Sequence, residues 1–187
     1  SVLHEMIDGW LDEDIGRLDI TTEFLIPADA TACFVLNTRD DVVICGIDVA
    51  SEVFHRHVPS CAVEILTPDG TRAKPGTSLA RVEGPARGLL TAERTALNLL
   101  QLMTGIATRT AEYADLVAGT GATLIDTRKT IPGYRALSKY AAVVGGARNH
   151  RNTLEDGVLI KDNHVAAAAA RGAGVAELVQ EARMGAP

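Results

Sequence analysis

The first part of the chain alternates between helical and extended hydrophobic patterns. Residues 2–15 place apolar side chains at helical spacing, which predicts an amphipathic helix, and residues 19–27 are expected to form a turn-rich link. Residues 46–58 predict a second helix. Short runs rich in β-branched and apolar residues predict strands at 31–38, 41–46, 61–66 and 78–84. Together these elements are typical of a small α+β layer.

The longest helical pattern begins at Pro85 and continues to about Ala118. Its apolar positions recur every three or four residues, and Gly105 is expected to interrupt the helix. This segment is predicted to connect the first region to a second one, so that residues 1–118 form one domain and residues 119–187 the next.

From Gly121 onward, short strands are expected to alternate with helices. Strands are predicted at 122–126, 142–146 and 157–161, and helices at 132–141, 164–172 and 175–184. This order is typical of a parallel sheet or an α/β barrel. A complete barrel takes about 250 residues, so the pattern predicts either a small open sheet or an incomplete barrel.

Polar clusters follow each of these three predicted strands. They are Thr127–Thr130, Asn149–Arg151 and Lys161–His164. Because the carboxyl ends of parallel strands meet at one edge of a sheet, where ligands bind in such folds, we expect the three clusters to line one site.

Charge is unevenly distributed along the chain. The formal net charge is −6, yet residues 126–151 contain six Lys or Arg and one acid, a net charge of +5. Such a basic region within an acidic protein favours a small polyanionic ligand, with a solvated basic face as the alternative. Nucleic acid is a less favoured partner, because the acidic remainder would repel phosphates and the segment shows no aromatic stacking pattern.

The overall composition is that of a globular protein. No apolar run approaches the roughly 20 residues that span a bilayer, and the acidic N-terminal segment does not resemble a signal peptide. We therefore expect a soluble, cytoplasmic protein that does not bind membranes. Cys33, Cys45 and Cys61 lie in apolar segments without a C-x-x-C pair, so buried reduced thiols are expected and a zinc site is not.

The polar clusters contain groups suited to binding anions. Thr127 and Thr130 supply hydroxyl donors, Gly145 and Gly146 would let backbone N–H groups approach a ligand, and His150 is a candidate ligand contact or acid–base group. Four permanent cations accompany them: Arg128, Lys129, Arg151 and Lys161.

Other polar residues are interpreted as structural. His55 and His57 are expected to be packing or surface residues, and Asp162 and Asn163 to cap the helix that follows them. No motif for a nucleophile or a phosphate-binding loop is present, so the sequence favours electrostatic stabilisation of a leaving group such as pyrophosphate over covalent catalysis.

Four motifs resemble one enzyme family in their order and spacing. They are GPARGLLTAERTALNLLQLMTGIAT, DTRKTIPGYRALSKYA, GGARNHR and VLIKDNH. They resemble nicotinate-nucleotide pyrophosphorylase (carboxylating), also called quinolinate phosphoribosyltransferase. The resemblance implies an α/β fold, in which an N-terminal α/β sandwich precedes the incomplete α/β barrel of type II phosphoribosyltransferases, and it implies a homodimer. It also implies a reaction of quinolinate with phosphoribosyl pyrophosphate (PRPP) and Mg²⁺ that yields nicotinate mononucleotide, pyrophosphate and CO₂ in NAD biosynthesis.

The same resemblance implies roles for individual residues. Lys129 and Lys161 would be catalytic, no residue is assigned to a metal, and Arg94 would reach the site of the neighbouring subunit. The substrate-binding residues implied by the motifs are Arg94, Thr127, Arg128, Lys129, His150, Arg151 and Lys161.

The chain departs from the family pattern at two places. Ala147 stands where a third glycine is usual, and Asn152 and Thr153 replace Met-Gly or Leu-Gly. The family's acidic residues for ribose and Mg²⁺ and its glycine-rich phosphate loop have no counterpart in the sequence. A ModD-like relative with another substrate, or a non-catalytic anion-binding module, therefore remains an alternative.

Overall fold

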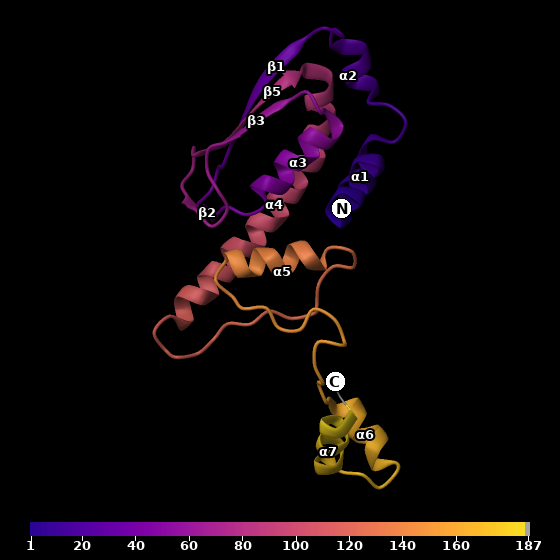
Figure 1. Cartoon of the computed structure of the whole chain (residues 1–187). Coiled ribbons are helices and arrows are strands. Elements are labelled where there is room, and N and C mark those ends of the chain that lie inside the picture. The colour runs from indigo at the N-terminus through magenta and orange to yellow at the C-terminus, as the bar shows by residue number, and fades with distance from the viewer. Residues whose placement is uncertain (186–187) are drawn as a thin grey trace. The chain divides into compact units, whose positions relative to one another are not determined.

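The fold is described for residues 1–185 of a computed structural model (Figure 1). The chain forms two units, one made of residues 1–126 and 130–149, the other of residues 127–129 and those from 150 onward. The predicted domain boundary at residues 118 and 119 stays a prediction, and residues 186–187 of the predicted second domain lie outside the described residues.

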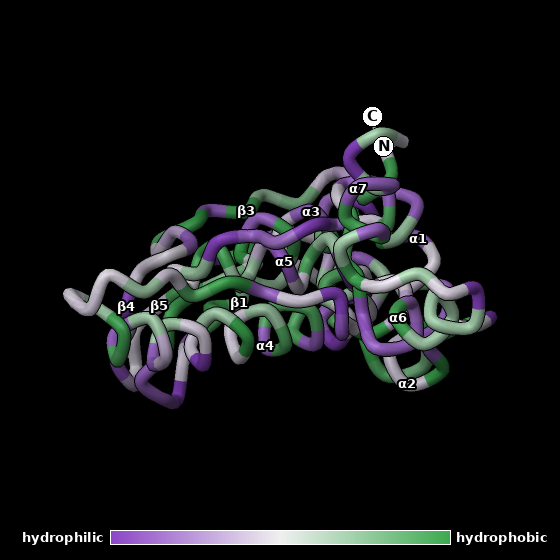
Figure 2. The backbone as a smooth tube through the Cα atoms, turned by 90° about the horizontal axis from the view of Figure 1, so that it is seen from below, coloured by the Kyte–Doolittle hydropathy of each residue, from purple (hydrophilic) through white to green (hydrophobic). Residues whose placement is uncertain are grey.

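A three-stranded antiparallel sheet forms one layer of the first unit. β5 (Ser78–Pro85) lies between β1 (Thr31–Asn37) and β3 (Ala62–Ile65). Figure 2 shows β1 as hydrophobic over much of its length. The predicted strands at 31–38, 61–66 and 78–84 are thus confirmed, and their apolar side chains supply one side of the core.

The predicted strand at 41–46 is much shorter than expected. Only β2 (Val42–Val43) pairs, with β4 (Arg72–Ala73), which the sequence pattern did not predict. Beyond it the backbone bonds to a helix instead, since the Cys45 N–H donates to Oγ1 of Thr104 at 3.2 Å and that hydroxyl donates to the Cys45 carbonyl at 3.1 Å.

Helices pack on the sheet of the first unit. α3 (Ile47–His57) and α4 (Ala86–Val117) run along it in Figure 1, and α1 (Val2–Ile15) packs against both helices, all three as predicted. The core is built from side chains that are almost fully buried, including Phe54, Met103, Val82 and Leu89. Burying such large apolar side chains is the main stabilising contribution to this unit.

Two expectations about the helices are wrong. Residues 19–27 contain a short helix, α2 (Ile20–Leu25), which begins because the Asp19 carboxylate accepts the Thr22 N–H at 3.0 Å. α4 continues through Gly105 without a break. Its buried face, with Met103 and Ala107 on either side of the glycine, packs into the core and outweighs the low helix propensity of one glycine.

The segment after α4 is less regular than predicted. Residues 122–126 form a single parallel bridge, Ile125 with Arg148, in place of a strand. Residues 142–144 belong to α5 (Arg135–Val144), because Ala141 and Ala142 are buried as helical neighbours of Leu137, so the strand expected there is wrong. Residues 157–160 pair with no strand among the described residues. The helices predicted at 132–141, 164–172 and 175–184 are confirmed as α5, α6 (Asp162–Ala169) and α7 (Val175–Gly185).

The cysteines differ in exposure. Cys45 and Cys61 are buried free thiols, as expected, whereas Cys33 is exposed because it lies on the outward face of β1. Burial, and after it the nearby Asp69 carboxylate, raises the pKa of Cys45 to about 12. Within residues 1–185 no helix combines the length and the apolar character needed to cross a bilayer.

Candidate active site

Two of the predicted polar clusters adjoin, in the sequence, residues of the first unit that are hydrogen-bonded to each other. The Asp126 N–H donates to the Arg148 carbonyl at 3.0 Å, and the Arg148 N–H donates to the Leu124 carbonyl at 2.8 Å. Asp126 directly precedes Thr127–Lys129, and Asn149 directly precedes His150. The bridge therefore brings together the points from which both clusters start.

The second unit contains a pocket of about 890 Å³ that unites three of the predicted cations. Arg128, Arg151 and Lys161 all line it, although they are separated by up to 33 positions in the sequence. Glu155 and Asp156 also line it, so the pocket carries two carboxylates beside the three cations. The cations are suited to the negative charges of a phosphate or carboxylate ligand.

The two arginines of the pocket are held differently. Nη1 of Arg151 donates to the Gly157 carbonyl at 2.8 Å, which ties its guanidinium to the loop of residues 152–157. Nε of Arg128 is buried and has no hydrogen-bond partner in the described part of the chain. A buried donor without a partner is costly, so this N–H is a group that an anionic ligand would satisfy.

The loop of residues 152–157, which departs from the family pattern at its first two positions, is held by hydrogen bonds within the loop. The Asp156 carboxylate accepts the N–H groups of Asn152 at 2.6 Å and Thr153 at 2.9 Å. Glu155, Asp156 and Gly157 line the pocket. The substituted positions thus take part in a closed turn at the pocket wall through their backbone, which does not depend on their side chains.

The start of α6 corrects the interpretation of Asp162 and Asn163 as caps. The helix begins at Asp162, Lys161 is the N-cap, and the Lys161 N–H donates to Nδ1 of His164 at 2.8 Å. Asn163 and His164 instead line the pocket, as expected for the cluster Lys161–His164. Their position directly after Lys161 in KDNH did not separate this role from capping, because a helix start explained the same residues equally well.

Three further predicted site residues do not line this pocket. Thr127, Lys129 and His150 are exposed. The Lys129 N–H donates to Oγ1 of Thr127 at 3.1 Å, which closes a local turn around Arg128. Their contacts with a ligand stay predictions.

Arg94 lies on α4 in the first unit, where it is exposed. Arg94 makes no ion pair within residues 1–185. Its side chain is thus available to a partner, and a role across a subunit interface stays a prediction.

Gly145 and Gly146 do not serve a ligand, contrary to expectation. Their N–H groups donate to the Ala141 and Val143 carbonyls and close the end of α5. A Cβ on Gly145 would lie 2.4 Å from the Ala107 carbonyl oxygen, so glycine is required there because α5 approaches α4 closely. Likewise, the Thr130 hydroxyl, expected to bind phosphate, accepts a hydrogen bond from Nε of Arg135 at 3.2 Å.

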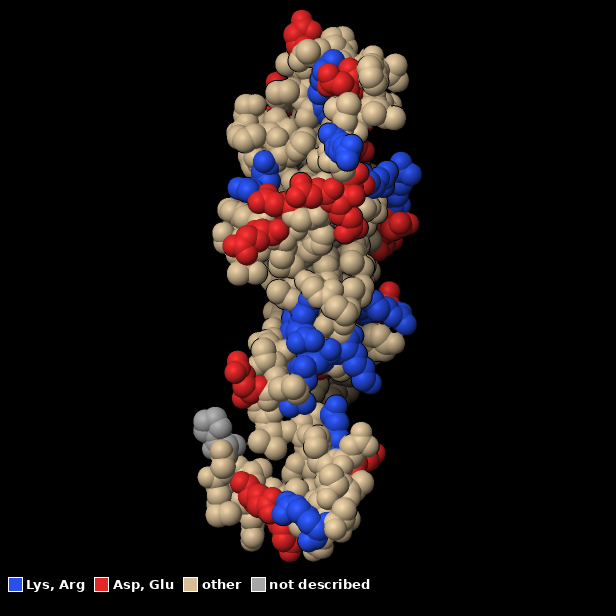
Figure 3. All heavy atoms as spheres, turned by 90° about the vertical axis from the view of Figure 1, so that its right-hand side faces the viewer, with Lys and Arg blue, Asp and Glu red and all other residues tan. Residues whose placement is uncertain are grey.

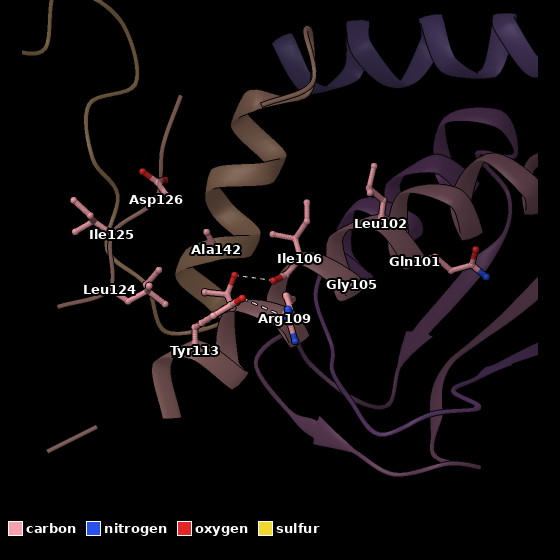
Figure 4. A pocket seen from close by; sticks show the side chains of 12 residues that line it. Gln101, Leu102, Gly105, Ile106, Arg109, Tyr113, Leu124, Ile125, Asp126 and Ala142 are labelled. Carbon is pink, nitrogen blue, oxygen red and sulfur yellow. Dashed lines mark hydrogen bonds between the residues drawn. The ribbon is translucent and has the colours of Figure 1, made fainter. Parts of the chain in front are cut away.

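A second pocket, of about 520 Å³, lies in the first unit between α4 and residues 124–126 (Figure 4). Its wall is mainly apolar, with Leu102 and Ile106 on α4 opposite Leu124. Its one cationic side chain, Arg109, is paired with Glu112 and Tyr113. A polyanion would find few partners there, so the pocket of the second unit is the better candidate.

The uneven charge expected from the sequence is visible on the surface. On the face shown in Figure 3, Lys and Arg side chains gather apart from the main groups of Asp and Glu. Among residues 1–185, no group of three His, Cys, Asp or Glu side chains is arranged to hold a metal ion.

Comparison with known proteins extends over nearly the whole chain. Residues 19–104 match the family Quinolinate phosphoribosyl transferase, N-terminal domain, and residues 106–187 match its C-terminal domain. Nicotinate-nucleotide pyrophosphorylase [carboxylating] of Mycobacterium leprae is 51% identical over 162 residues, 84% of this chain and 56% of the relative. A probable nicotinate-nucleotide pyrophosphorylase [carboxylating] of Synechocystis is 40% identical over 168 residues. The chain spans 56% of the length of each of these relatives.

Solved structures agree with these matches. NadC from Streptococcus pyogenes superposes with a TM-score of 0.92 at 34% identity, covering 98% of this chain and 64% of that one. Nicotinate-nucleotide pyrophosphorylase from Francisella tularensis gives a TM-score of 0.91 at 35% identity, covering 98% and 63%. The α/β fold class expected from the four motifs is thereby confirmed. The chain belongs to the quinolinate phosphoribosyltransferase family.

Proposed function

We propose that the protein transfers the phosphoribosyl group of PRPP to quinolinate and releases CO₂. The observation that carries this proposal is the pocket of the second unit, in which Arg128, Arg151 and Lys161 converge and Nε of Arg128 is a buried donor without a partner among residues 1–185. The relatives named nicotinate-nucleotide pyrophosphorylase support it.

The proposed chemistry uses the cations for binding and charge stabilisation. The quinolinate ring nitrogen donates its electron pair to the anomeric carbon of PRPP while the bond to pyrophosphate breaks. The bond from C2 to its carboxylate then breaks, CO₂ leaves, and its electron pair stays on C2 beside the positively charged ring nitrogen. A proton added at C2 completes nicotinate mononucleotide.

Each cation has a task that fits its shape. The planar guanidinium groups of Arg128 and Arg151 suit the carboxylates of quinolinate or the phosphate of the sugar, and the compact ammonium of Lys161 suits the charge that develops on departing pyrophosphate. Lys129, assigned a catalytic role by its motif, would assist from outside the described pocket wall. Magnesium would be bound largely by phosphate oxygens of PRPP, as is usual for this ion.

The proposal includes a homodimer in which Arg94 of each subunit reaches the active site of the other subunit. Its support is an apolar surface on α2, where Ile20, Phe24 and Leu25 are 64%, 79% and 72% exposed. Large apolar side chains grouped on a surface are typical of an interface. A cytoplasmic location, with no nucleic-acid or membrane partner, is also proposed, from the acidic net charge of −6.

The test is an assay of the complete protein that contains this sequence. With quinolinate, PRPP and Mg²⁺, it should form nicotinate mononucleotide, and nicotinate should be a poor substrate because it leaves part of the cationic site unpaired, at about 1 to 3 kcal/mol per group. Equal turnover of nicotinate would contradict a dicarboxylate site. Pyrophosphate binding without turnover of either acid would identify an anion-binding module instead.

A further inference from the structure

Lys139 is a buried lysine on α5, which is unusual for this residue type. Lys139 is only 3% exposed, and its Nζ donates to Oδ1 of Asp126 at 2.6 Å. The pair joins residues 13 positions apart, and the Asp126 side chain is itself only 8% exposed. Lys139 is one of the six cations of the basic segment, but it is too deeply buried to meet a ligand.

Asn149 joins the same buried pair. Its side-chain amide faces two acceptors, so its nitrogen donates to the Lys139 carbonyl at 3.2 Å and to Oδ2 of Asp126 at 2.7 Å. The Asp126 carboxylate thus receives Lys139 on one oxygen and Asn149 on the other. Figure 4 shows Asp126 on the segment that passes α5.

Lys139, Asp126 and Asn149 form a hydrogen-bonded network, and two of its members directly precede segments that carry cations. Asp126 is followed directly by Thr127–Lys129, and Asn149 is followed directly by His150 and Arg151. The backbone bridge between Asp126 and Arg148 lies beside the network. Both segments that carry the predicted substrate contacts therefore start directly after a residue that is hydrogen-bonded to Lys139.

We propose that Lys139, Asp126 and Asn149 are positioning residues that set the spacing of the two cation-bearing segments for a polyanion. The inference rests on the proposed function only in taking the pocket of Arg128 and Arg151 as an anion site. None of the three touches the ligand. Displacing catalytic or binding groups by about 1 Å can cost up to about 100-fold, so a small shift at the start of each segment matters.

A purely structural role is the competing explanation, and a charge-free double variant separates the two. Lys139→Met leaves a buried carboxylate without its cation, and Asp126→Asn leaves a buried cation without its anion, so each should lower the melting temperature. The double variant K139M/D126N contains no unpaired buried charge. Its melting temperature should recover toward that of the wild type, while the ion pair that holds the start of one segment to α5 is still lost. The backbone bonds between Asp126 and Arg148 remain in all of these variants, so the comparison isolates the side-chain network.

The experiment measures binding of inorganic pyrophosphate by calorimetry, using the complete protein at a temperature where the variants are folded. We expect each single variant and the double variant to bind about 10-fold to 100-fold more weakly than the wild type. Asn149→Ala, which keeps the ion pair and removes the side-chain hydrogen bonds at the start of the other segment, should also bind more weakly. The control Val82→Ala, in the core of the sheet, should lower the melting temperature and leave binding unchanged.

Recovery of binding together with the melting temperature in the double variant would overturn the inference, as would wild-type binding by Asn149→Ala. If a single variant does not fold, the double variant and Asn149→Ala decide. A wild-type protein that binds pyrophosphate but does not convert quinolinate would refute the proposed function and leave this comparison intact. A wild-type protein that does not bind pyrophosphate would refute the inference, because there would be no anion site to position.

Discussion

Lys129 provides the clearest test of a single predicted catalytic residue. Its side chain is exposed and contributes little to the core, so Lys129→Ala should fold normally. Loss of one preorganised charge contact should cost about 3 to 4 kcal/mol in the transition state, a drop in kcat of about 100-fold to 1,000-fold. Steady-state kinetics with quinolinate and PRPP measure this drop.

Lys74→Ala is the matched control for Lys129→Ala. Lys74 is also an exposed lysine, but it pairs with Asp41 beside β4 in the first unit. Its removal should leave kcat unchanged. Near-normal activity of Lys129→Ala, or unfolding of that variant alone, would show that the role assigned to Lys129 is wrong.

The thiols provide a test of burial at single residues. Burial and the Asp69 carboxylate raise the pKa of Cys45 to about 12, and burial raises that of Cys61, so both should stay protonated at pH 8 and unreactive. Cys33 is exposed and should react first with a disulfide reagent. Because the folded state holds the Cys45 proton more tightly, the stability contributed by this group is complete below the unfolded pKa and is lost as the pH rises toward 12.

A spectrophotometric thiol titration of the native protein should therefore show one fast thiol, with the other two reacting only on unfolding. Cys33→Ser should abolish the fast phase. Rapid reaction of Cys45 in the native protein would contradict its burial beside α4.

The cations of the site could be predicted from the sequence, and the residues that support them could not. Arg128, Arg151 and Lys161 follow predicted strand ends, where polar residues have little structural reason to gather. Lys139 has the same charge, but only the packing of α5 buries it against Asp126. Sequence spacing does not distinguish a cation that faces a ligand from one that faces a carboxylate 13 positions away.

Two glycines, one inside α4 and one at the end of α5, lead to opposite predictions for the effect of alanine on stability. Gly145 closes α5, and a Cβ there would meet the Ala107 carbonyl oxygen at 2.4 Å, so Gly145→Ala should lower the free energy of unfolding by about 1 to 3 kcal/mol. Gly105 lies inside α4 with no atom within 4 Å of a Cβ, so Gly105→Ala should raise it by about 0.5 to 1 kcal/mol. Urea denaturation measures both changes.

Destabilisation by Gly105→Ala would show that α4 is interrupted at that position, as the sequence had predicted. A neutral Gly145→Ala would show that α5 and α4 do not approach as closely as described.

Helices were predicted more successfully than strands because periodicity is a local property. The apolar spacing in α1, α3 and α4 identifies a buried face without knowledge of the partner. Residues 142–146 contain a short apolar run that suits a strand or a buried helix, and the contact of α5 with α4 decides in favour of the helix. Residues 41–46 lose most of their strand because Thr104 and Thr108 offer side-chain partners to the backbone.

At the level of the assembled molecule, the proposed exchange of Arg94 predicts complementation. Arg94→Ala and Lys129→Ala homodimers should each be nearly inactive. After joint unfolding and refolding, half of the dimers are mixed, and each mixed dimer has one wild-type site, so about a quarter of normal activity should return. Activity is measured against a parallel sample in which mixed dimers are quantified by a tag.

As a control, the Arg94→Ala protein alone, unfolded and refolded in the same way, should regain no activity. If the mixed dimers form and remain inactive, Arg94 does not act across the interface. The sequence could suggest this arrangement only through the resemblance of its AERT motif, because the exposure of Arg94 on α4 is equally compatible with a solvated helix charge.

The cationic pocket is proposed to bind quinolinate for alkylation of its ring nitrogen before decarboxylation. The most direct measurement is release of labelled CO₂ from quinolinate labelled in its C2 carboxylate, by the complete protein with Mg²⁺, with and without PRPP. We predict release that depends strictly on PRPP and equals the nicotinate mononucleotide formed, because only the alkylated ring can hold the electron pair left on C2. Release of CO₂ in the absence of PRPP, or no release in its presence, would contradict this account.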